Sequence, residues 1–205
     1  MLLSFIFPVY NEEDFLNSQV ENFIKIAQKE YKNKFEVILV ENGSSDCSWN
    51  LVKKLEKRFS FIKSQSLPVA SYGMAIRHGL INAVGDKIFL LNVDYFDFDF
   101  IKKASKLLNT IDLVIGSKTL TNSNDQRPFY RRIGTYLFNA FLRLVLNYPG
   151  TDTHGIKAFR RSKRLINIVK NCRTQNELFD TELILRLTRS GAIFVSSKRK
   201  CTTCN

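Results

Sequence analysis

The chain has 205 residues and a formal net charge of +12, from 31 Lys and Arg against 19 Asp and Glu. A hydrophobic content of 44% is enough to bury a proper core, and we expect one domain over residues 1–205. The first residues run into an apolar segment without a basic stretch or cleavage site, which argues against a signal peptide and predicts a cytoplasmic protein. Cys201 and Cys204 form a Cys-x-x-Cys with no second pair, which argues against a zinc site.

The chain alternates strands and helices. Apolar runs rich in β-favouring residues predict strands, and apolar positions at helical spacing predict helices. Strands are predicted over residues 2–7, 35–40, 61–64, 88–91, 112–115 and 192–195, and helices over 15–27, around 51–55, and over 74–84, 99–108 and 177–189. This alternation predicts an α/β fold with a mainly parallel sheet flanked by helices.

Polar residues between these elements are predicted to begin or end helices. Asn11 is placed to cap the first helix, and Ser44 and Asp46 are good helix caps in the polar turn that follows residues 35–40. Gly85 is placed to end the helix over 74–84.

Residues 88–91, with Val93 close behind, are typical of a strand buried on both faces of a parallel sheet. Asp94 follows this strand, and Asp97 and Asp99 come soon after. Ligands of open α/β sheets bind outside the carboxyl ends of the strands, so these carboxylates lie where a substrate or metal would be met. On this stretch alone, Asp94 serves equally well as the start of a turn.

Positive charge is concentrated in one part of the chain. Between Lys118 and Arg164 there are ten Lys and Arg against two Asp. A local positive patch indicates an anionic partner, either a nucleic acid, a phosphorylated substrate or an acidic membrane surface.

Residues 133–146, inside this basic segment, are almost wholly apolar. Their exceptions, Thr135, Asn139 and Arg143, recur every fourth residue and form a narrow polar stripe along a helix. A helix that spans a bilayer needs about 20 apolar residues, and this one has only about 14. We therefore expect an amphipathic helix in the membrane interface, with a buried core helix as the alternative.

Seven short motifs follow one another in the order that family 2 glycosyltransferases carry them. They are Pro8-x-Tyr10-Asn11-Glu12, Val40 to Asp46, Gly85-Asp86, Asn92-x-Asp94, Gly116-Ser117-Lys118, Phe129 to Arg132 and Gly155 to Arg161. Over nearly its whole length the chain resembles this family, and most closely the dolichol-phosphate mannose synthase group. The resemblance implies a Rossmann-like GT-A fold and transfer of a sugar from a nucleotide-diphosphate sugar to a polyprenyl phosphate.

The resemblance also implies which residues hold the donor nucleotide. Glu12 would accept a hydrogen bond from a ribose hydroxyl, and Glu41, where the family usually has Asp, would accept one from a base N–H. The implied donor-binding residues are Pro8, Tyr10, Glu12, Glu41, Gly43 and Asn92.

The metal motif departs from the family pattern. Asn92-x-Asp94 and Phe96 stand where the family usually has Asp-x-Asp followed two positions later by Gln. Hard cations prefer charged oxygen ligands, and Asp94 is the one that remains, with Asn92 offering a carbonyl and Asp97 close by. We expect a weakened Mg²⁺ or Mn²⁺ site at Asp94 and Asn92.

Cations in the basic segment match the family's acceptor-phosphate positions. Lys118 and Arg131 match directly, and Arg127 and Arg132 are near enough in sequence to assist, although Arg127 serves equally well as a solvated side chain. The resemblance gives Asp94 and Arg131 catalytic roles. Glu182 matches an acidic position of the family, with a helix-dipole role as the alternative.

We expect an inverting transfer in which the acceptor's phosphate oxygen attacks the anomeric carbon. A phosphate is already ionised near neutral pH, so the protein's role is orientation and charge neutralisation. A hydroxyl acceptor would need a base, for which Asp97, Asp180 and Glu182 are the candidates.

Two other classes of function stay open. Asn92 and Phe96 favour a degenerate, non-catalytic domain that binds a nucleotide sugar or a partner. A nucleic-acid binder is disfavoured by the apolar helix inside the basic segment, and we expect no nucleic acid as partner. The expected location is the cytoplasmic face of a membrane, as a peripheral protein.

Overall fold

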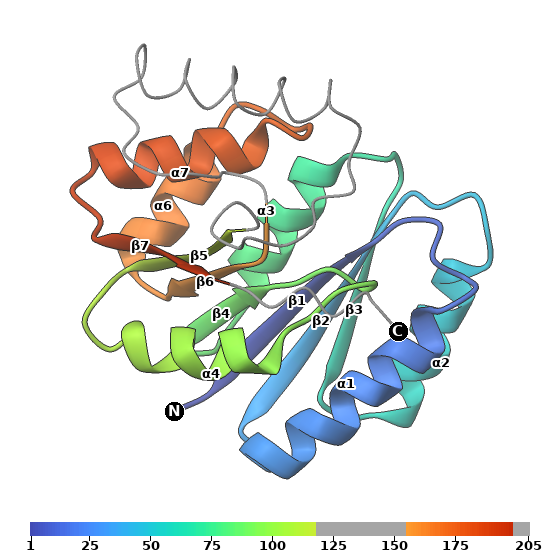
Figure 1. Ribbon diagram of the computed structural model, residues 1–205. Coiled ribbons are helices and arrows are strands. Elements are labelled where there is room, and N and C mark those ends of the chain that lie inside the picture. The colour runs from blue at the N-terminus through green and yellow to red at the C-terminus, as the bar shows by residue number, and fades with distance from the viewer. Residues whose placement is uncertain (118–154, 199–205) are drawn as a thin grey trace, which may run out of the picture.

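The computed structural model describes residues 1–117 and 155–198, which form a seven-stranded sheet with helices on both faces (Figure 1). The first elements are β1 (Leu3–Val9), α1 (Leu16–Tyr31), β2 (Phe35–Asn42), α2 (Ser48–Arg58), β3 (Ile62–Leu67), α3 (Tyr72–Asn82) and β4 (Lys87–Leu90). They are followed by α4 (Phe98–Leu107), β5 (Leu113–Ser117), β6 (Lys157–Arg160), α6 (Lys163–Asn171), α7 (Phe179–Arg189) and β7 (Phe194–Lys198).

The strand order is β3-β2-β1-β4-β6-β5-β7, so β4 is the central strand. Neighbouring strands are parallel except where β6 is involved, because β6 runs antiparallel to both β4 and β5. The predicted α/β class and mainly parallel sheet are confirmed. The carboxyl ends of β1, β2 and β4 lie at one edge, and so does Lys157, the first residue of β6, which pairs with Leu90 and Ile115.

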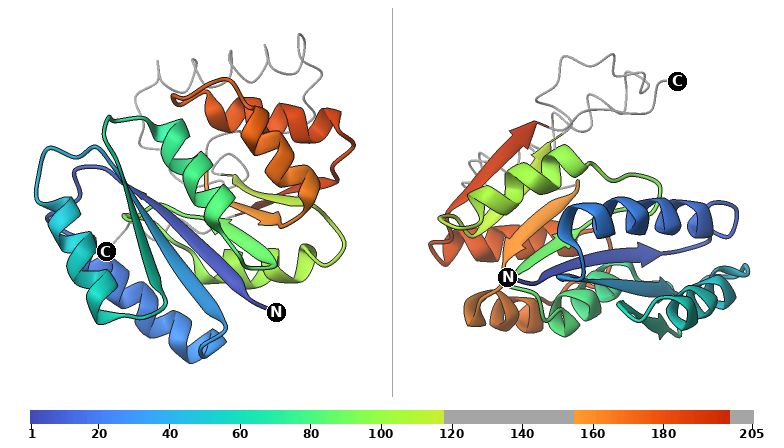
Figure 2. Two further views of the ribbon diagram at one scale, coloured as in Figure 1. Left: turned by 180° about the vertical axis from the view of Figure 1, so that it is seen from behind. Right: turned by 90° about the horizontal axis from the view of Figure 1, so that it is seen from below.

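The sheet separates two apolar layers, and Figure 2 shows from two further sides the helices that cover its faces. Alternation along each strand sends neighbouring side chains to opposite layers. Phe5 and Phe89 lie with α1, α2 and α4, and their rings stack with centroids 5.3 Å apart. Ile6 and Leu90 lie with α3, α6 and α7. Strand β4 is buried at all four positions, as predicted.

Two predicted helix ends are wrong. Asn11 has a φ of 52° and does not cap α1, which starts at Leu16 with Phe15 as N-cap. Helix α3 ends at Asn82, with Ala83 as an extended C-cap, so Gly85 does not end it. Gly85 is required for close approach instead, because a Cβ there would lie 2.6 Å from Ser4 Oγ.

Helix α6 was not predicted. The hydroxyl of Ser162 accepts a hydrogen bond from Leu165 N–H at 3.1 Å and so caps the helix. Leu165 and Val169 are buried, and this i, i+4 pair is the core-facing part of a helix of only 9 residues. The segment is too short and too basic for the apolar spacing to be conspicuous in the sequence.

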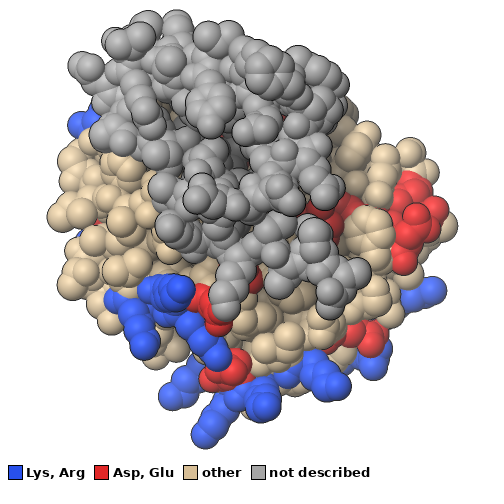
Figure 3. All heavy atoms as spheres, in the orientation of Figure 1, with Lys and Arg blue, Asp and Glu red and all other residues tan. Residues whose placement is uncertain are grey.

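Basic side chains of the described residues are spread over several elements. Helices α1 and α4 carry exposed lysines at positions 25, 29, 102, 103 and 106. In Figure 3, Lys and Arg gather along the lower margin of the face shown. Positive charge is therefore not confined to residues 118–164.

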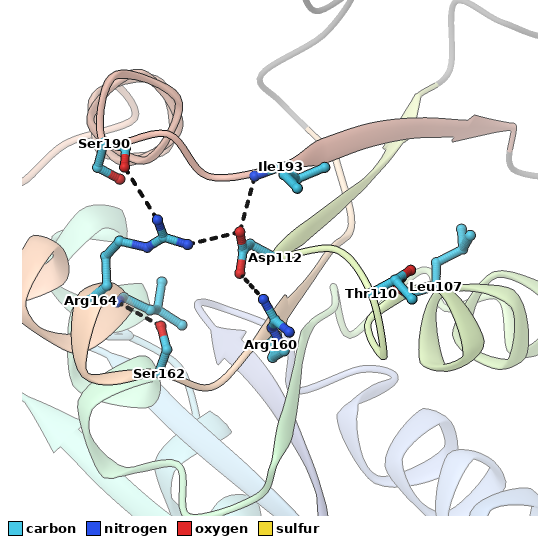
Figure 4. Close-up of polar contacts among 9 residues, drawn as sticks. Leu107, Thr110, Asp112, Arg160, Ser162, Arg164, Ser190 and Ile193 are labelled. Carbon is cyan, nitrogen blue, oxygen red and sulfur yellow. Dashed lines mark hydrogen bonds and ion pairs between the residues drawn. The ribbon is translucent and has the colours of Figure 1, made fainter.

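Several cations of the basic segment have protein partners. Asp112 accepts hydrogen bonds from Arg160 at 2.5 Å, from Arg164 at 2.8 Å and from Ile193 N–H at 3.0 Å (Figure 4). Arg161 donates to the carbonyl of Ala83 at 2.8 Å. These arginines join β5, β6, α6 and β7, so this part of the charge serves the fold.

In the part of the chain that the structure describes, no helix is both long and apolar enough to cross a membrane. The amphipathic helix predicted over residues 133–146 lies outside the described residues.

Candidate functional site

Two polar residues that follow β4, Asn92 and Asp94, have exposed side chains. Val93 is 2% exposed, whereas Asn92 and Asp94 on either side of it are exposed. Leu91 N–H donates to the carbonyl of Ile6 at 2.9 Å, which keeps this segment aligned with β1. Alternation therefore presents Asn92 and Asp94 together at the carboxyl edge of the sheet.

Glu12 and Asp94 lie in the loops that follow the neighbouring parallel strands β1 and β4. Partial burial raises the pKa of Glu12 above its ordinary 4.5, and the carboxylates of Asp94 and Asp46 raise it further. The N–H of Glu12 donates to Ser48 Oγ at 2.8 Å, which fixes the backbone at this point. The result is a concentration of negative charge that favours a cation or a hydrogen-bond donor.

Reciprocal hydrogen bonds join the β1–α1 loop to the β2–α2 loop. The N–H of Asn11 donates to Ser44 Oγ at 3.1 Å, and Asn11 Oδ1 accepts from Ser45 N–H at 2.9 Å. The N–H of Glu13 donates to Asp46 Oδ2 at 3.1 Å. The other oxygen of Asp46 accepts from Ser48 N–H at 2.9 Å in the first turn of α2. None of the predicted caps is an N-cap residue: the N-cap of α2 is Cys47, Asp46 only bonds to the first turn of this helix, and Asn11 and Ser44 hold the two loops together.

Glu41 is 3% exposed and lies at the end of β2. One of its carboxylate oxygens accepts from Ser44 N–H, and the other accepts from the hydroxyl of Ser66 at 2.5 Å. Glu41 therefore anchors the β2–α2 loop to the neighbouring strand β3. Ser66 was not singled out from the sequence, since a lone serine in a short strand carries no signal.

Gly43 has a φ of 67°, in the left-handed region that glycine adopts readily. A Cβ at this position would lie 2.7 Å from Ala70 N, because the loop after β3 crosses directly over it. Two further predicted residues border the same edge: Tyr10 is 49% exposed and Pro8 is half-buried.

Phe96 takes no part in a polar site. Its ring packs edge-on against Phe23 at 5.3 Å and against Phe98 at 5.9 Å, so an apolar contact occupies the place of a ligand. Asp97 Oδ1 accepts from Phe100 N–H at 3.0 Å and caps α4. The expected assistance of Asp97 to a metal is thus replaced by a capping role for this oxygen.

Residues 1–117 and 155–198 contain no group of three or more His, Cys, Asp or Glu side chains placed to hold a metal ion. The exposed carboxylate of Asp94 and the exposed amide of Asn92 nevertheless form an oxygen donor set that suits a hard divalent cation. The other coordination positions of such an ion would be filled by water or by substrate phosphates, as is common for Mg²⁺.

The carboxylate of Glu182 is held by several hydrogen bonds from neighbouring residues. It accepts from the N–H of Arg173 at 2.9 Å, from Thr174 N–H at 2.8 Å, from the Thr174 hydroxyl at 2.6 Å and from Arg186 Nε at 2.7 Å. Burial alone would raise the pKa of Glu182, but the hydrogen bonds from Thr174, Arg173 and Arg186 outweigh it and lower the pKa to about 2. Such a carboxylate is a poor base near neutral pH.

Asp180, in the first turn of α7, forms an ion pair with Lys157. Asp180 Oδ2 and Lys157 Nζ are 2.6 Å apart, and the side chains are 1% and 0% exposed. The hydroxyl of Tyr72 donates to the same oxygen at 3.4 Å. Lys157 and Tyr72 were not singled out for this role; the only sequence signal was a lysine inside an apolar strand.

The predicted phosphate-binding cations Lys118, Arg127, Arg131 and Arg132 lie outside the described residues. Of the predicted site, the structure places Glu12, Asn92 and Asp94 after the neighbouring parallel strands β1 and β4 and ties the Glu41–Gly43 turn to the same edge.

Comparisons with known proteins agree with this architecture. The chain is 29% identical over 199 residues to a dolichyl-phosphate beta-glucosyltransferase of Trichomonas vaginalis, an alignment that covers 89% of this chain and 60% of the relative. It is 29% identical over 180 residues to an undecaprenyl-phosphate 4-deoxy-4-formamido-L-arabinose transferase of Proteus mirabilis, covering 83% of this chain and 52% of the relative. The chain thus spans less than two thirds of the length of these relatives.

A mannosyltransferase from Pyrobaculum calidifontis, solved in complex with GDP-Man and Mn²⁺, has the same fold. Its TM-score is 0.62 at 18% identity, and the match covers 96% of this chain and 54% of that chain. Residues 4–175 match the Glycosyl transferase family 2 description. With its mainly parallel sheet flanked by helices and its polar carboxyl edge, the chain belongs to glycosyltransferase family 2 and has the GT-A fold.

Proposed function

We propose that this chain carries the sugar-transfer site of an inverting glycosyltransferase that moves a sugar from a nucleotide-diphosphate sugar to a polyprenyl phosphate. The observation that carries the proposal is that Glu12 and Asp94 follow the adjacent parallel strands β1 and β4, at the carboxyl edge of a family 2 chain. The relatives named for dolichyl-phosphate and undecaprenyl-phosphate transfer support the acceptor class.

The donor nucleotide would lie across the loops after β1 and β2. Pro8 and Tyr10 would form a wall for the base, and Glu12 would accept from a ribose hydroxyl. Gly43 would let the backbone approach the ligand closely. Glu41 already holds Ser44 and Ser66, and each carboxylate oxygen keeps a further lone pair for a base N–H.

A divalent cation, Mg²⁺ or Mn²⁺, would be held by Asp94 and Asn92. When bound, such an ion would neutralise charge on the leaving nucleoside diphosphate. The amide of Asn92 is a weaker ligand than a carboxylate, so we expect modest metal affinity. The Mn²⁺ present in the Pyrobaculum calidifontis mannosyltransferase complex supports a divalent ion at this fold's site.

The acceptor phosphate would be held by Lys118 and Arg131, with Arg127 and Arg132 assisting. Arg131 offers a planar, bidentate fork to phosphate oxygens, which a lysine does not. These residues would orient the phosphate for in-line attack on the anomeric carbon.

The described carboxylates support a phosphate acceptor over a hydroxyl acceptor. A hydroxyl must lose its proton to a base, whereas a phosphate is already ionised. Each candidate base has another role: Asp97 caps α4, Asp180 is paired with Lys157, and Glu182 is held by Thr174 and Arg186. An ionised acceptor removes the need for any of them.

The second candidate function is a non-catalytic domain that binds a nucleotide sugar or a partner. The packing of Phe96 against Phe23, where the family usually has a polar residue, is the observation that favours it. Binding without turnover distinguishes this function from an enzyme.

For the location, we propose a peripheral protein on the cytoplasmic face of a membrane, where a lipid phosphate is accessible. The apolar character of residues 133–146 and the neighbouring arginines support this placement.

The proposal is tested first by thermal stabilisation with a panel of nucleotide sugars, each with and without Mn²⁺, since a bound ligand raises the melting temperature. The best donor, carrying a radiolabelled sugar, is then incubated with a polyprenyl phosphate. Labelled product in the lipid phase supports the enzyme. Stabilisation without labelled lipid supports the non-catalytic domain.

A further inference from the structure

We propose that Asp180 is a positioning residue for the transfer, which acts with Lys157 to hold the start of β6 at the carboxyl edge of β4. This inference rests on the proposed function and deepens it, because it gives Asp180 a role other than that of a base.

The geometry of the pair excludes direct contact with a substrate in this arrangement. Asp180 is 1% exposed and Lys157 is 0% exposed, so neither side chain reaches solvent. Asp180 Oδ2 lies 2.6 Å from Lys157 Nζ, and the same ammonium donates to the carbonyl of Gly155 at 2.8 Å. The carboxylate thus faces a lysine, and the lysine fixes the backbone that enters β6.

The pair is linked to the candidate site through the sheet. Lys157 is paired in the sheet with Leu90 of β4 and Ile115 of β5. Leu90 is two residues before Asn92 and four before Asp94. A shift of Lys157 would therefore displace the end of β4, and with it Asn92 and Asp94.

A second chain of contacts ties the pair to the β2–α2 side of the site. Tyr72, which donates to Asp180, is the first residue of α3. The preceding Ser71 donates its N–H to Asn42 Oδ1 at 2.6 Å, at the end of β2. The Ser71 hydroxyl and the N–H of Gly73 both donate to the carbonyl of Gln175, at 2.6 Å and 2.9 Å, just before α7. The starts of α3 and α7 are thereby held together beneath the edge.

A buried ion pair is a costly way to achieve stability alone. Desolvation of two charges commonly cancels their attraction, and apolar residues of similar size do as well or better. The second oxygen of Asp180 is buried and accepts no hydrogen bond from the described residues, which adds to the cost. The role that we infer for this buried charged pair is to hold Gly155 and the start of β6 in a fixed position.

The test compares the wild-type protein with Asp180→Asn, Lys157→Met and the double variant, all close in shape to the native side chains. Transfer is measured well below the melting temperature of the least stable variant, so that every protein is folded. Each single variant leaves one buried charge unpaired, and we expect kcat to fall about a hundredfold through misplacement. The double variant buries no charge and should regain most of the melting temperature, but it still lacks the bond to Gly155, so its kcat should stay low, with the pH profile unchanged in shape.

Asp112→Asn is the matched control. It weakens a partly buried set of ion pairs among β5, β6 and α6 and should lower the melting temperature without changing kcat. Two results overturn the proposal. If Lys157→Met is active while both proteins lacking the carboxylate are dead, Asp180 is a base. If all folded variants, or the double variant alone, turn over like the wild type, the pair serves stability only.

A wild-type protein without transfer activity would contradict the proposed function and leave a separate readout for this inference. The same four proteins are titrated with UDP and with GDP in the presence of Mn²⁺. Loss of affinity in all three variants supports positioning, and recovery in the double variant overturns it. Equal affinity in all four overturns it.

Discussion

At the scale of single residues, Asp94 is the carboxylate on which the proposed chemistry depends most. It is exposed at the end of the central strand, and its charge is close enough to raise the pKa of Glu12. Asp94→Asn removes this charge without changing the size of the side chain. We expect the variant to fold normally and to lose transfer, because the cation that neutralises the leaving group would no longer be held.

Asn92→Asp is the complementary change. It restores a second carboxylate beside Asp94, so transfer should be retained and should depend on Mg²⁺ or Mn²⁺ at lower concentration. Initial rates against metal concentration, with melting curves as controls, measure both variants. Full activity of Asp94→Asn in the presence of a chelator would exclude a metal site at this residue.

The lowered pKa of Glu182 predicts that the stability of the fold decreases at acid pH. Its pKa lies near 2 in the folded protein against an ordinary 4.5. A lowered carboxylate pKa contributes stability that is fully present above pH 4.5 and is lost as the pH falls toward 2. Glu182→Gln should cost about 1–3 kcal/mol at neutral pH, because several hydrogen bonds to a charge are weakened.

The measurement is a series of melting curves from neutral pH downward. The melting temperatures of the wild type and of Glu182→Gln should converge as the pH falls from 4.5 toward 2. A difference that stays constant over this range would mean that the charge of Glu182 does not stabilise the fold.

At the scale of elements, the β2–α2 turn is the segment most constrained by its neighbours. Gly43→Ala would strain a φ of 67° and would place a Cβ 2.7 Å from Ala70 N. We expect a loss of about 1–3 kcal/mol in stability and a weaker affinity for the nucleotide, because the loop after β3 must move.

Gly191→Ala provides a matched control for this change. Gly191 has a similar φ of 78°, but a Cβ there meets nothing within 4 Å. It should therefore lose stability through strain alone and keep its nucleotide affinity. Equal affinities for UDP or GDP in both variants would show that the β2–α2 turn is not part of the nucleotide site.

The sequence predicts elements with strong local patterns and misses features set by distant contacts. The buried run of β4 identifies the central strand and places Asp94 at its end. The antiparallel direction of β6 could not be predicted, since its apolar residues fit either direction. The roles of Asn11 and Gly85 depend on Ser45 and Ser4, which are remote in sequence and adjacent only after folding.

In the candidate site, too, sequence patterns predict some features and miss those that depend on contacts between distant residues. Motif positions place Glu12 and Asp94 after two strands that the structure shows to be parallel neighbours, and parallel strands deliver their following loops to one edge. The pairing of Lys157 with Asp180 was not foreseen, because neither residue type is expected in a core. Of the three candidate bases, Asp97 and Glu182 bond to groups near them in sequence, whereas the partner of Asp180 comes from another element, β6.

At the scale of the whole molecule, the distribution of charge bears on where the protein works. Three arginines form hydrogen bonds within the fold: Arg160, Arg161 and Arg164. Other cations, including those beside residues 133–146, would therefore supply the attraction to an anionic surface. We predict binding to liposomes that contain anionic lipid, with binding that decreases as salt increases. Each basic residue near such a surface contributes roughly 1 kcal/mol.

The double variant Leu137→Asp/Phe141→Asp tests this prediction through the apolar side of the predicted helix. Sedimentation with liposomes should show loss of binding while the melting curve stays normal. A collapsed melting curve would instead mean that residues 133–146 belong to the core.

The identity of the bond that is formed tests the central claim most directly. The wild-type protein is incubated with the best-stabilising nucleotide sugar, Mn²⁺ and a polyprenyl phosphate, and the lipid product is examined by ³¹P NMR and mass spectrometry. We expect a glycosyl phosphodiester whose anomeric configuration is inverted relative to the donor. A sugar attached to a hydroxyl acceptor, a retained configuration, or donor binding without any lipid product would contradict it.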